Sequence, residues 1–339
     1  SLTNLGMVEI GAESSTNDTS AEDAKTTVSN MDVYGFNPNS PIIDNTRVSG
    51  VTHAAITGRP SQNIFSGTGF VANMTGELNS VENEKAFIYV QLGSRGGKLA
   101  GGSRSAALSQ LRNALSDALN YASRFGGPDD GDALHRRDAA ALQDAARGRM
   151  PIIIGADRAS DLLQIIDLKK EFRLDVIIAG AAEGWMVADD LAAADMRVIV
   201  DPVANLPGSF DVVGSRIDNT ALMSAAGVEL AIMSFSESTS HNVRVLNQHA
   251  GNAVANGLSW DQALDAISVT PADWFGVNIG GVAQGSNTFV VWDGDPLQAT
   301  SAPILIMIDG QEQSLMSRQR ELRDRYNPTR EDTRAHKYR

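Results

Sequence analysis

The chain has 339 residues, a formal net charge of −13 and no cysteine. Its length allows one large core, such as a single β/α barrel with additions. The acidic balance argues against nucleic acid or an anionic membrane as the main partner, and no apolar run approaches the roughly 20 residues of a membrane span. The lack of cysteine excludes disulfides and thiolate metal sites. It fits an oxidising space, so a periplasmic or extracytoplasmic location is slightly favoured over the cytoplasm.

The first part of the chain is poor in regular patterns. Residues 1–45 are polar and predict a surface segment. The stretch GVTHAAITG, 50–58, predicts a strand bounded by glycines, with His53 inside it. His53 is interpreted either as a core histidine or as a site residue whose face points into a barrel. In the following stretch, Gly67 and Gly69 predict a tight loop.

A strand and two helices are predicted between residues 85 and 147. The strand is KAFIYVQL, 85–92, and the glycine-rich stretch 93–105 that follows it predicts a flexible loop. This stretch does not match a phosphate-binding loop, because Leu follows the Lys and the glycine spacing differs. Leucines at intervals of three and four residues predict a helix over 105–125, and a second helix is predicted over 132–147.

From Met150 onward, apolar runs and helical patterns alternate. The predicted strands are 152–156, 175–180, 197–201 and 228–234, and the predicted helices are 161–172, 186–194, 219–226 and 241–256. Strands that recur every 20 to 30 residues with helices between them predict a parallel sheet, open or closed into a barrel. In both forms, ligand sites lie just beyond the carboxyl ends of the strands.

The pattern changes near the C-terminus. Two strands are predicted over 288–292 and 304–309, followed by a charged tail that is predicted to be helical up to Tyr326. We therefore expect three parts: a barrel over 1–285, part of a small β domain over 286–316, and the tail 317–339.

Several stretches together resemble the amidohydrolase superfamily, in particular its imidazolonepropionase-like bacterial branch. They are GLSWDQALDAISVTPADWFGV, VVWDGDPLQATSAPILIMIDGQ, GVTHAAITG and the block from Pro151 to Asp201. The resemblance implies a (β/α)8 TIM-type barrel, a small β domain, and hydrolysis of C–N bonds by water bound to one or two divalent metals such as zinc. It also implies that small-domain strands found before the first ligand motif in the family are absent here or come from elsewhere.

The positions where the resemblance places metal ligands hold other residues. The first His-x-His motif corresponds to Leu2-Thr3-Asn4, and a second one corresponds to Gly155-Ala156-Asp157. Two further histidines correspond to Gly180 and Trp185, and the essential aspartate corresponds to Phe235. The sequence therefore predicts a degenerate metal site without a bound metal or other cofactor.

The first functional hypothesis is a pseudoenzyme that binds a ligand or serves in an assembly. Its partner would be a small molecule, a second copy of the chain or a catalytically complete relative. Arg158 would pair with a ligand carboxylate and Trp185 would form an apolar wall; mutual salt bridges among the charged residues are the alternative interpretation. The candidate pocket residues are His53, Asp157, Arg158, Glu183, Trp185, Asp201 and Glu237.

The second hypothesis is an active hydrolase of non-peptide C–N bonds, in amides or cyclic amides. Its single metal would be held by His53, Asp157, Glu183 and Asp201. A metal-free variant would use Ser234 or Ser236 with His241 as the base. His241 and His249 are about two helical turns apart, which is too far for one ion.

Overall fold

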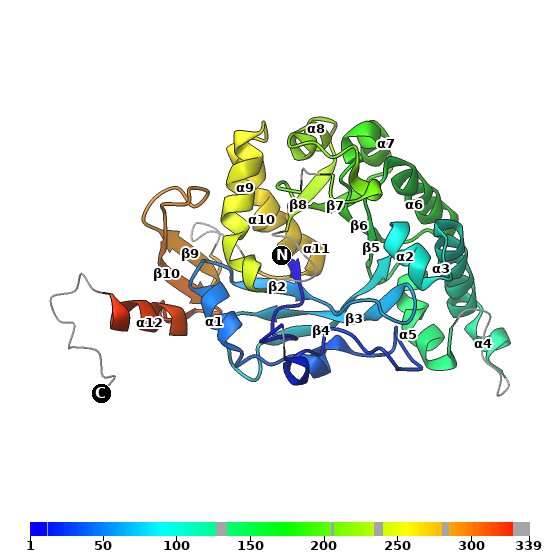
Figure 1. Cartoon of the computed structure of the whole chain (residues 1–339), viewed down its shortest axis with the longest axis horizontal. Coiled ribbons are helices and arrows are strands. Elements are labelled where there is room, and N and C mark those ends of the chain that lie inside the picture. Colours follow the sequence, from blue (N-terminus) through cyan, green and yellow to red (C-terminus); the bar gives the residue numbers. More distant parts are fainter. Residues whose placement is uncertain (12, 127–133, 205–206, 234–239, 280–284, 328–339) are drawn as a thin grey trace.

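The computed structural model describes residues 1–11, 13–126, 134–204, 207–233, 240–279 and 285–327 (Figure 1). Its described strands form one large curled sheet in the order β1 to β8, and a small sheet in the order β11-β10-β9. The large sheet contains β1 (Leu2–Thr3), β2 (His53–Ile56), β3 (Phe65–Asn73), β4 (Val81–Gln91), β5 (Ile152–Ala156), β6 (Val176–Gly180), β7 (Arg197–Val200) and β8 (Glu229–Ile232). The small one contains β9 (Phe289–Trp292), β10 (Pro303–Ile308) and β11 (Gln311–Glu312).

The large sheet is mixed, which corrects the prediction of a regular (β/α)8 alternation. β1 pairs with β2 in parallel, and the strands from β4 to β8 are parallel to one another, with Ile152 opposite Val176. β3 is antiparallel to both β2 and β4. The connections on either side of β3 are too short for a crossover helix, so these strands form hairpins. The carboxyl ends of all strands except β3 therefore lie along one edge of the sheet.

Helices follow the strands and cover the convex side of the sheet, as α3, α6, α7 and α8 show in Figure 1. The helices are α1 (Pro41–Arg47), α2 (Gly93–Leu99), α3 (Arg104–Leu119), α4 (Tyr121–Arg124), α5 (Arg136–Ala146), α6 (Ala159–Phe172), α7 (Ala188–Ala193), α8 (Asn219–Ala225), α9 (Leu246–Ala255), α10 (Trp260–Ile267), α11 (Val269–Phe275) and α12 (Arg318–Tyr326). Short 3-10 helices cover Ser14–Thr16, Asp32–Gly35, Gly184–Val187, Phe210–Val212 and Ser240–Val245.

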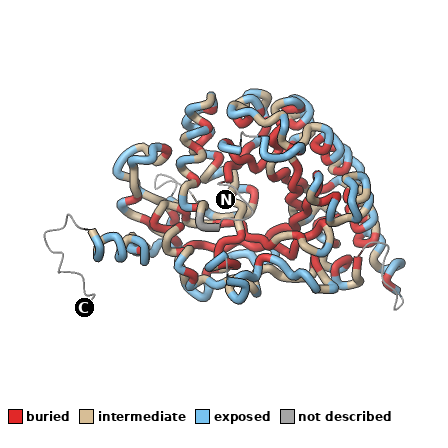
Figure 2. The backbone as a smooth tube through the Cα atoms, in the orientation of Figure 1, coloured by how far each residue is buried: buried red, intermediate tan, exposed pale blue. Residues whose placement is uncertain are grey.

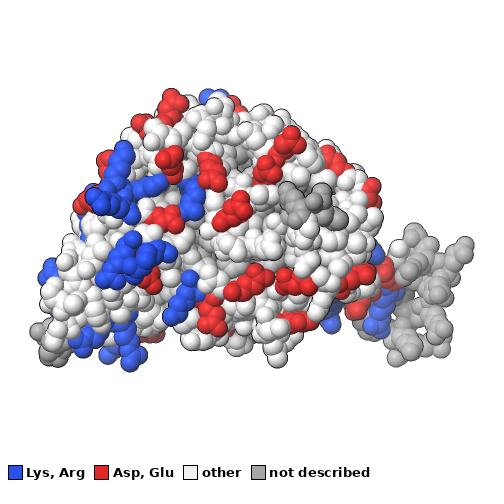
Figure 3. All heavy atoms as spheres, turned by 180° about the vertical axis from the view of Figure 1, so that it is seen from behind, with Lys and Arg blue, Asp and Glu red and all other residues white. Residues whose placement is uncertain are grey.

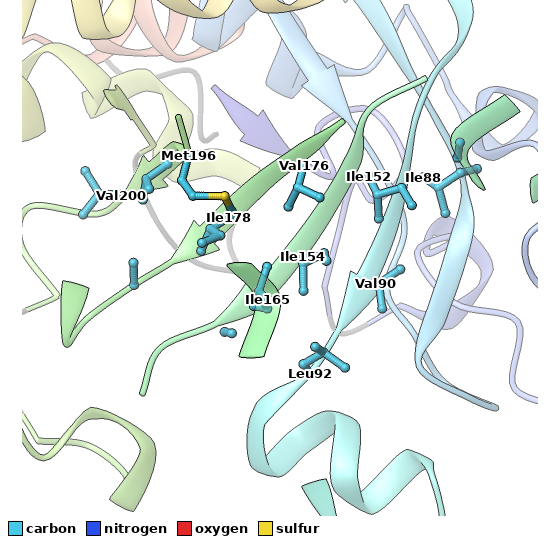
Figure 4. Close-up of a cluster of buried hydrophobic side chains, with 14 of the residues drawn as sticks. Ile88, Val90, Leu92, Ile152, Ile154, Ile165, Val176, Ile178, Met196 and Val200 are labelled. Carbon is cyan, nitrogen blue, oxygen red and sulfur yellow. The ribbon is translucent and has the colours of Figure 1, made fainter. Parts of the chain in front are cut away.

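The core has two sides because successive strand residues point to opposite faces. Ile152, Ile154 and Val176 belong to the large cluster that packs against the helices (Figure 4), and the sheet backbone is buried along most of its length (Figure 2). Ile153 and Ile177 belong to a smaller cluster on the inner face of the curl. Burying each of these side chains contributes about 1.5–3 kcal/mol, which explains why the unbroken apolar runs form central strands.

Two predicted loops are regular elements in the structure. Gly67 and Gly69 lie inside the long strand β3 rather than in a tight turn. The predicted flexible loop 93–105 contains helix α2 and the start of α3. The glycines are needed because other groups lie where side chains would be: a Cβ on Gly69 would meet the Phe87 ring at 2.4 Å, and one on Gly96 would overlap the carbonyl of Gln91.

The polar N-terminal segment is anchored more firmly than predicted. Leu5 and Val28 are fully buried. The backbone N–H groups of Thr27 and Ser29 donate to the buried carboxylate of Asp138 on α5, at 3.0 and 2.8 Å.

The described part of the chain contains no helix that is long and apolar enough to cross a membrane. Figure 3 shows acidic side chains spread over the face opposite to that of Figure 1, with basic ones gathered toward one end.

Candidate functional site

A cavity of about 430 Å³ lies at the carboxyl ends of the strands, and we call it the strand-end cavity. Every described strand of the large sheet except β3 contributes a residue from its end or from the loop beyond it. Its polar lining includes Asn4 after β1, Thr57 and Arg59 after β2, Gln91 at the end of β4, Arg95 on α2, Asp157 after β5, Asp201 after β7, and Asp211. The position matches the sequence-based expectation for a ligand site in this class of sheet.

Tyr89 and Gln91 form the floor of this cavity. Both are buried, and the Tyr89 hydroxyl donates to Oε1 of Gln91 at 3.0 Å. The Gln91 amide donates to the carbonyls of Leu92 and Gly155 at 3.0 and 3.1 Å. A Cβ on Gly155 would lie 2.5 Å from the Tyr89 hydroxyl and 2.9 Å from Oε1 of Gln91. The space beside Gly155 is therefore filled by two side chains that hydrogen bonds hold in place.

Asp157 fills the corresponding space beside Gly180. A Cβ on Gly180 would lie 2.5 Å from Oδ1 of Asp157, and its φ of +111° is a conformation that only glycine adopts readily. Oδ1 of Asp157 accepts from the backbone N–H of Ala182 at 3.3 Å. Burial raises the pKa of Asp157 to about 6, and the carboxylates of Asp211 and Glu183 add to this shift.

Glu183 is committed to the backbone. It is buried, and Oε2 accepts from the N–H of Ala159 at 3.0 Å while Oε1 accepts from the N–H of Gly214 at 3.0 Å. The carboxylate thus ties the start of α6 to the loop before α8. It does not belong to the described lining of the strand-end cavity.

Arg158 and Trp185 are also engaged outside the described lining of the cavity. The Arg158 guanidinium donates to Asp161 at 2.8 Å on the first turn of α6. The Trp185 indole donates to the carbonyl of Gly214 at 2.8 Å, and the Arg216 guanidinium lies over its ring, 4.8 Å from the centroid. The structure therefore does not bring these two side chains together with Asp157 as ligand contacts.

Asp201 lies in the cavity lining and pairs with a histidine that sequence reasoning did not select. Its Oδ1 is 3.1 Å from Nδ1 of His249 on α9 and accepts from the N–H of Val203 at 3.0 Å. Only the three-dimensional packing of α9 against this edge reveals the contact, because 48 residues separate the pair.

Asp211 is a second residue that sequence reasoning missed. Its carboxylate accepts from the backbone N–H of Ser94 at 2.7 Å and is paired with the Arg104 guanidinium. Burial alone would raise the pKa of Asp211, but these hydrogen bonds and the cation lower it below its usual value. No local pattern in the sequence distinguishes Asp211 from other loop aspartates.

His53 lies at the start of β2, at the opposite end from Thr57 and Arg59. Its Nε2 is 2.7 Å from Oε1 of Glu82, and Nδ1 is 3.2 Å from the Thr52 hydroxyl. It lines a different cavity, of about 410 Å³, which lies beside the starts of β1 and β2, α11 and β9 and which we call the β9-side cavity. The structure thus does not bring His53 together with the carboxylates at the strand ends.

Several candidates lie outside the described residues. They are Glu237, both serines of the metal-free variant (Ser234 and Ser236) and Phe235, and the His241 side chain is likewise not described. Among the residues that are described, no group of three or more His, Asp or Glu side chains could hold a metal ion. Both carboxylate oxygens of Glu183 already accept a backbone N–H, and His53 lines a different cavity from Asp157 and Asp201, so the structure does not gather the candidate ligands of the single-metal hypothesis at one place.

Comparisons with known proteins support the fold. No protein-family model and no curated protein sequence matches the chain. A solved structure of an amidohydrolase from Thermotoga maritima MSB8 is similar, with a TM-score of 0.80 and 22% sequence identity, over 92% of this chain and 84% of that chain. At this identity the likeness concerns the fold alone. The chain therefore has the fold of this amidohydrolase.

Proposed function

We propose that this chain is an amidohydrolase-like protein that binds a small molecule in the strand-end cavity and does not carry out metal-assisted hydrolysis. The proposal includes the finer parts of the resemblance, a TIM-type barrel of the imidazolonepropionase-like bacterial branch. Assembly with a second copy or with a catalytically complete relative stays a prediction.

The packing around Gly155 carries this proposal. The resemblance places a histidine ligand at this position, yet the Tyr89 hydroxyl and the Gln91 amide occupy the space that an imidazole would need. Protein interiors are close-packed, so a filled space of this kind is a built feature of the core. The Asp157 carboxylate occupies the corresponding space at Gly180, a further position where the resemblance places a histidine.

The commitment of the carboxylates also supports the proposal. A metal ligand needs an oxygen lone pair directed at the ion. Both oxygens of Glu183 accept backbone N–H groups, and Asp201 is shared between Val203 and His249. These hydrogen bonds stabilise the loops around the cavity, which is a sufficient physical role for buried carboxylates.

Metal content tests the proposal. The protein would be produced with added zinc and manganese, dialysed, and analysed by mass spectrometry. A site built for a divalent ion retains the metal through dialysis. Since the proposal assigns no such site to this chain, we expect less than about a tenth of an equivalent of metal. A stoichiometric metal would overturn the proposal. Loss of that metal in His53→Ala would then support the alternative hydrolase, which a panel of cyclic amides and N-acyl amino acids would assay.

A further inference from the structure

One cation in the strand-end cavity has no matching anion among the described residues. Arg59 follows β2, where its backbone N–H donates to the carbonyl of Thr19 at 2.6 Å, and its side chain lines the cavity. The Nε atom of Arg59 is buried and, in the described part of the chain, has no hydrogen-bond partner. A buried N–H without an acceptor is unfavourable, so the described protein groups leave the hydrogen-bonding capacity of the Arg59 guanidinium partly unused.

A second guanidinium increases the positive charge at this place. Arg95, at the start of α2, lines the same cavity. Burial lowers the pKa of Arg59, and the neighbouring Arg95 cation lowers it further. The protein surroundings thus oppose the charge on Arg59, and an anion bound beside it would reverse this effect.

The hydrogen bonds found for the nearby carboxylates are made to groups other than Arg59. Asp211 pairs with Arg104 and Ser94, and Asp201 pairs with His249 and Val203. Asp157 has its pKa raised to about 6 by burial and by neighbouring carboxylates, and no interaction of it with Arg59 is found among the described residues. The described protein groups therefore leave Arg59 for a ligand.

The rest of the lining limits the charge and shape of that ligand. Three carboxylates in the same lining, Asp157, Asp201 and Asp211, repel a doubly charged group such as a phosphate monoester more strongly than a singly charged one. Apolar side chains complete the lining, including Leu2, Pro60, Val200 and Met233. A single negative charge on an apolar body suits both features.

We propose that the strand-end cavity binds a small monocarboxylate with an apolar body, whose carboxylate pairs with Arg59. This inference rests on the proposed function of the cavity as a ligand site. Arg59 is the residue that selects an acid over its neutral analogue, because a guanidinium presents donors in the planar geometry that a carboxylate accepts.

Calorimetry on the full chain tests the inference with 3-phenylpropionate, its neutral amide 3-phenylpropionamide, and phenyl phosphate. We expect the acid to bind at least about tenfold more tightly than the amide, and more tightly than phenyl phosphate. Arg59→Met, which keeps the apolar stem, should reduce the affinity for the acid to that for the amide. Arg59→Lys should retain part of the preference, and Arg112→Met on α3 should leave it unchanged.

The outcomes separate this inference from the proposed function. Equal binding of acid and amide, unaffected by Arg59→Met, would overturn the monocarboxylate assignment while the cavity remained a ligand site. Tighter binding of phenyl phosphate, or no binding of any probe at millimolar concentration, would also overturn the assignment. The circular dichroism spectrum of Arg59→Met must match that of the unmodified protein, and the metal analysis decides the proposed function independently.

Discussion

The strand-end cavity and the β9-side cavity are similar in size, about 430 and 410 Å³, but differ in how they hold charge. In the described lining of the β9-side cavity the titratable side chains are His53 and Asp265, among many apolar groups. The described lining of the strand-end cavity contains five charged side chains: Arg59, Arg95, Asp157, Asp201 and Asp211.

The difference follows from the direction of the strands. Loops after parallel strands present backbone N–H groups that are not paired within the sheet. These groups donate hydrogen bonds to carboxylates such as Asp211. At the start of β2 the backbone is already paired within the sheet, and His53 and Glu82 bind each other instead. At the strand ends, backbone N–H groups of the loops thus stabilise buried carboxylates. At the start of β2, the charged side chains stabilise each other instead.

Among the substitutions considered, replacing Glu183 should lower the free energy of unfolding most, because two backbone N–H groups donate to its carboxylate. Glu183→Ala should lower the free energy of unfolding by about 3 kcal/mol, since each unsatisfied N–H costs about 1–3 kcal/mol. Glu183→Gln should cost less, because one oxygen remains. Urea unfolding would measure both variants against Glu312→Ala, an exposed glutamate on β11. A cost for Glu183→Ala no greater than that for Glu312→Ala would show that loop donors do not need this carboxylate.

Replacing Asp157 is expected to change the free energy of unfolding less than replacing Glu183, and to increase it. Its pKa is raised to about 6 in the folded protein, so the folded state binds the proton more tightly than the unfolded chain. Stability contributed by this group therefore falls as pH rises from about 4 to 6 and stays lower above that range. The rise of the Asp157 pKa from its usual value to about 6 corresponds to a free-energy difference of about 3 kcal/mol, which the partial exposure of the side chain reduces.

Asp157→Asn should accordingly raise the free energy of unfolding by about 1 kcal/mol at neutral pH. It should have little effect near pH 4, and the Asn side-chain oxygen can still accept from Ala182. Urea unfolding at several pH values would measure the difference. A variant whose stabilisation does not depend on pH would show that ionisation of Asp157 is not the cause.

Breaking the His53–Glu82 pair should change the free energy of unfolding least. Burial alone would raise the pKa of Glu82, but the hydrogen bond and charge of His53 and the Asn73 amide lower it overall. This pair therefore stabilises the fold above the pKa of an unfolded glutamate, about 4.3, and the stabilisation is lost as pH falls through the lower folded value.

Glu82→Gln should cost less than about 1 kcal/mol near pH 6, because Glu82 is 29% exposed and such pairs are weakened by solvent. The cost should vanish near pH 3. Glu84→Gln, an exposed glutamate on the same strand, is the matched control in thermal unfolding at both pH values. An equal cost for both variants would mean that the pair with His53 contributes nothing.

The sequence predicted the central strands well because burial on both faces requires unbroken apolar runs. β5 covers 152–156 as predicted, and β6 and α6 agree within two residues at each end. The failures at β3 and α2 share one cause. Glycine indicates a turn when read locally, but Gly69 and Gly96 are required because Phe87 and the Gln91 carbonyl approach them. That requirement depends on the tertiary structure and has no local sequence signal.

For the candidate site, too, one part could be predicted from the sequence and another part could not. Strand-end positions could be read from the sequence, which placed Asp157 and Asp201 at the correct edge. The partners of each side chain could not, because they come from distant segments, as for Asp201 with His249 and Glu183 with Gly214. Arg59 was missed because it follows a strand whose selected residue, His53, lies at the other end.

The packing beside Gly180 and Gly155 also restricts how this protein could change. Introducing histidine at either position by one substitution would force a side chain into occupied space, and Gly180 would also have to leave a left-handed backbone conformation. Such a single-step variant is expected to fold poorly. A design that installs a metal here must therefore first shorten Tyr89 and Gln91 and reshape the turn after β6. Whether a metal site can be installed here therefore depends on the order of the substitutions more than on their number.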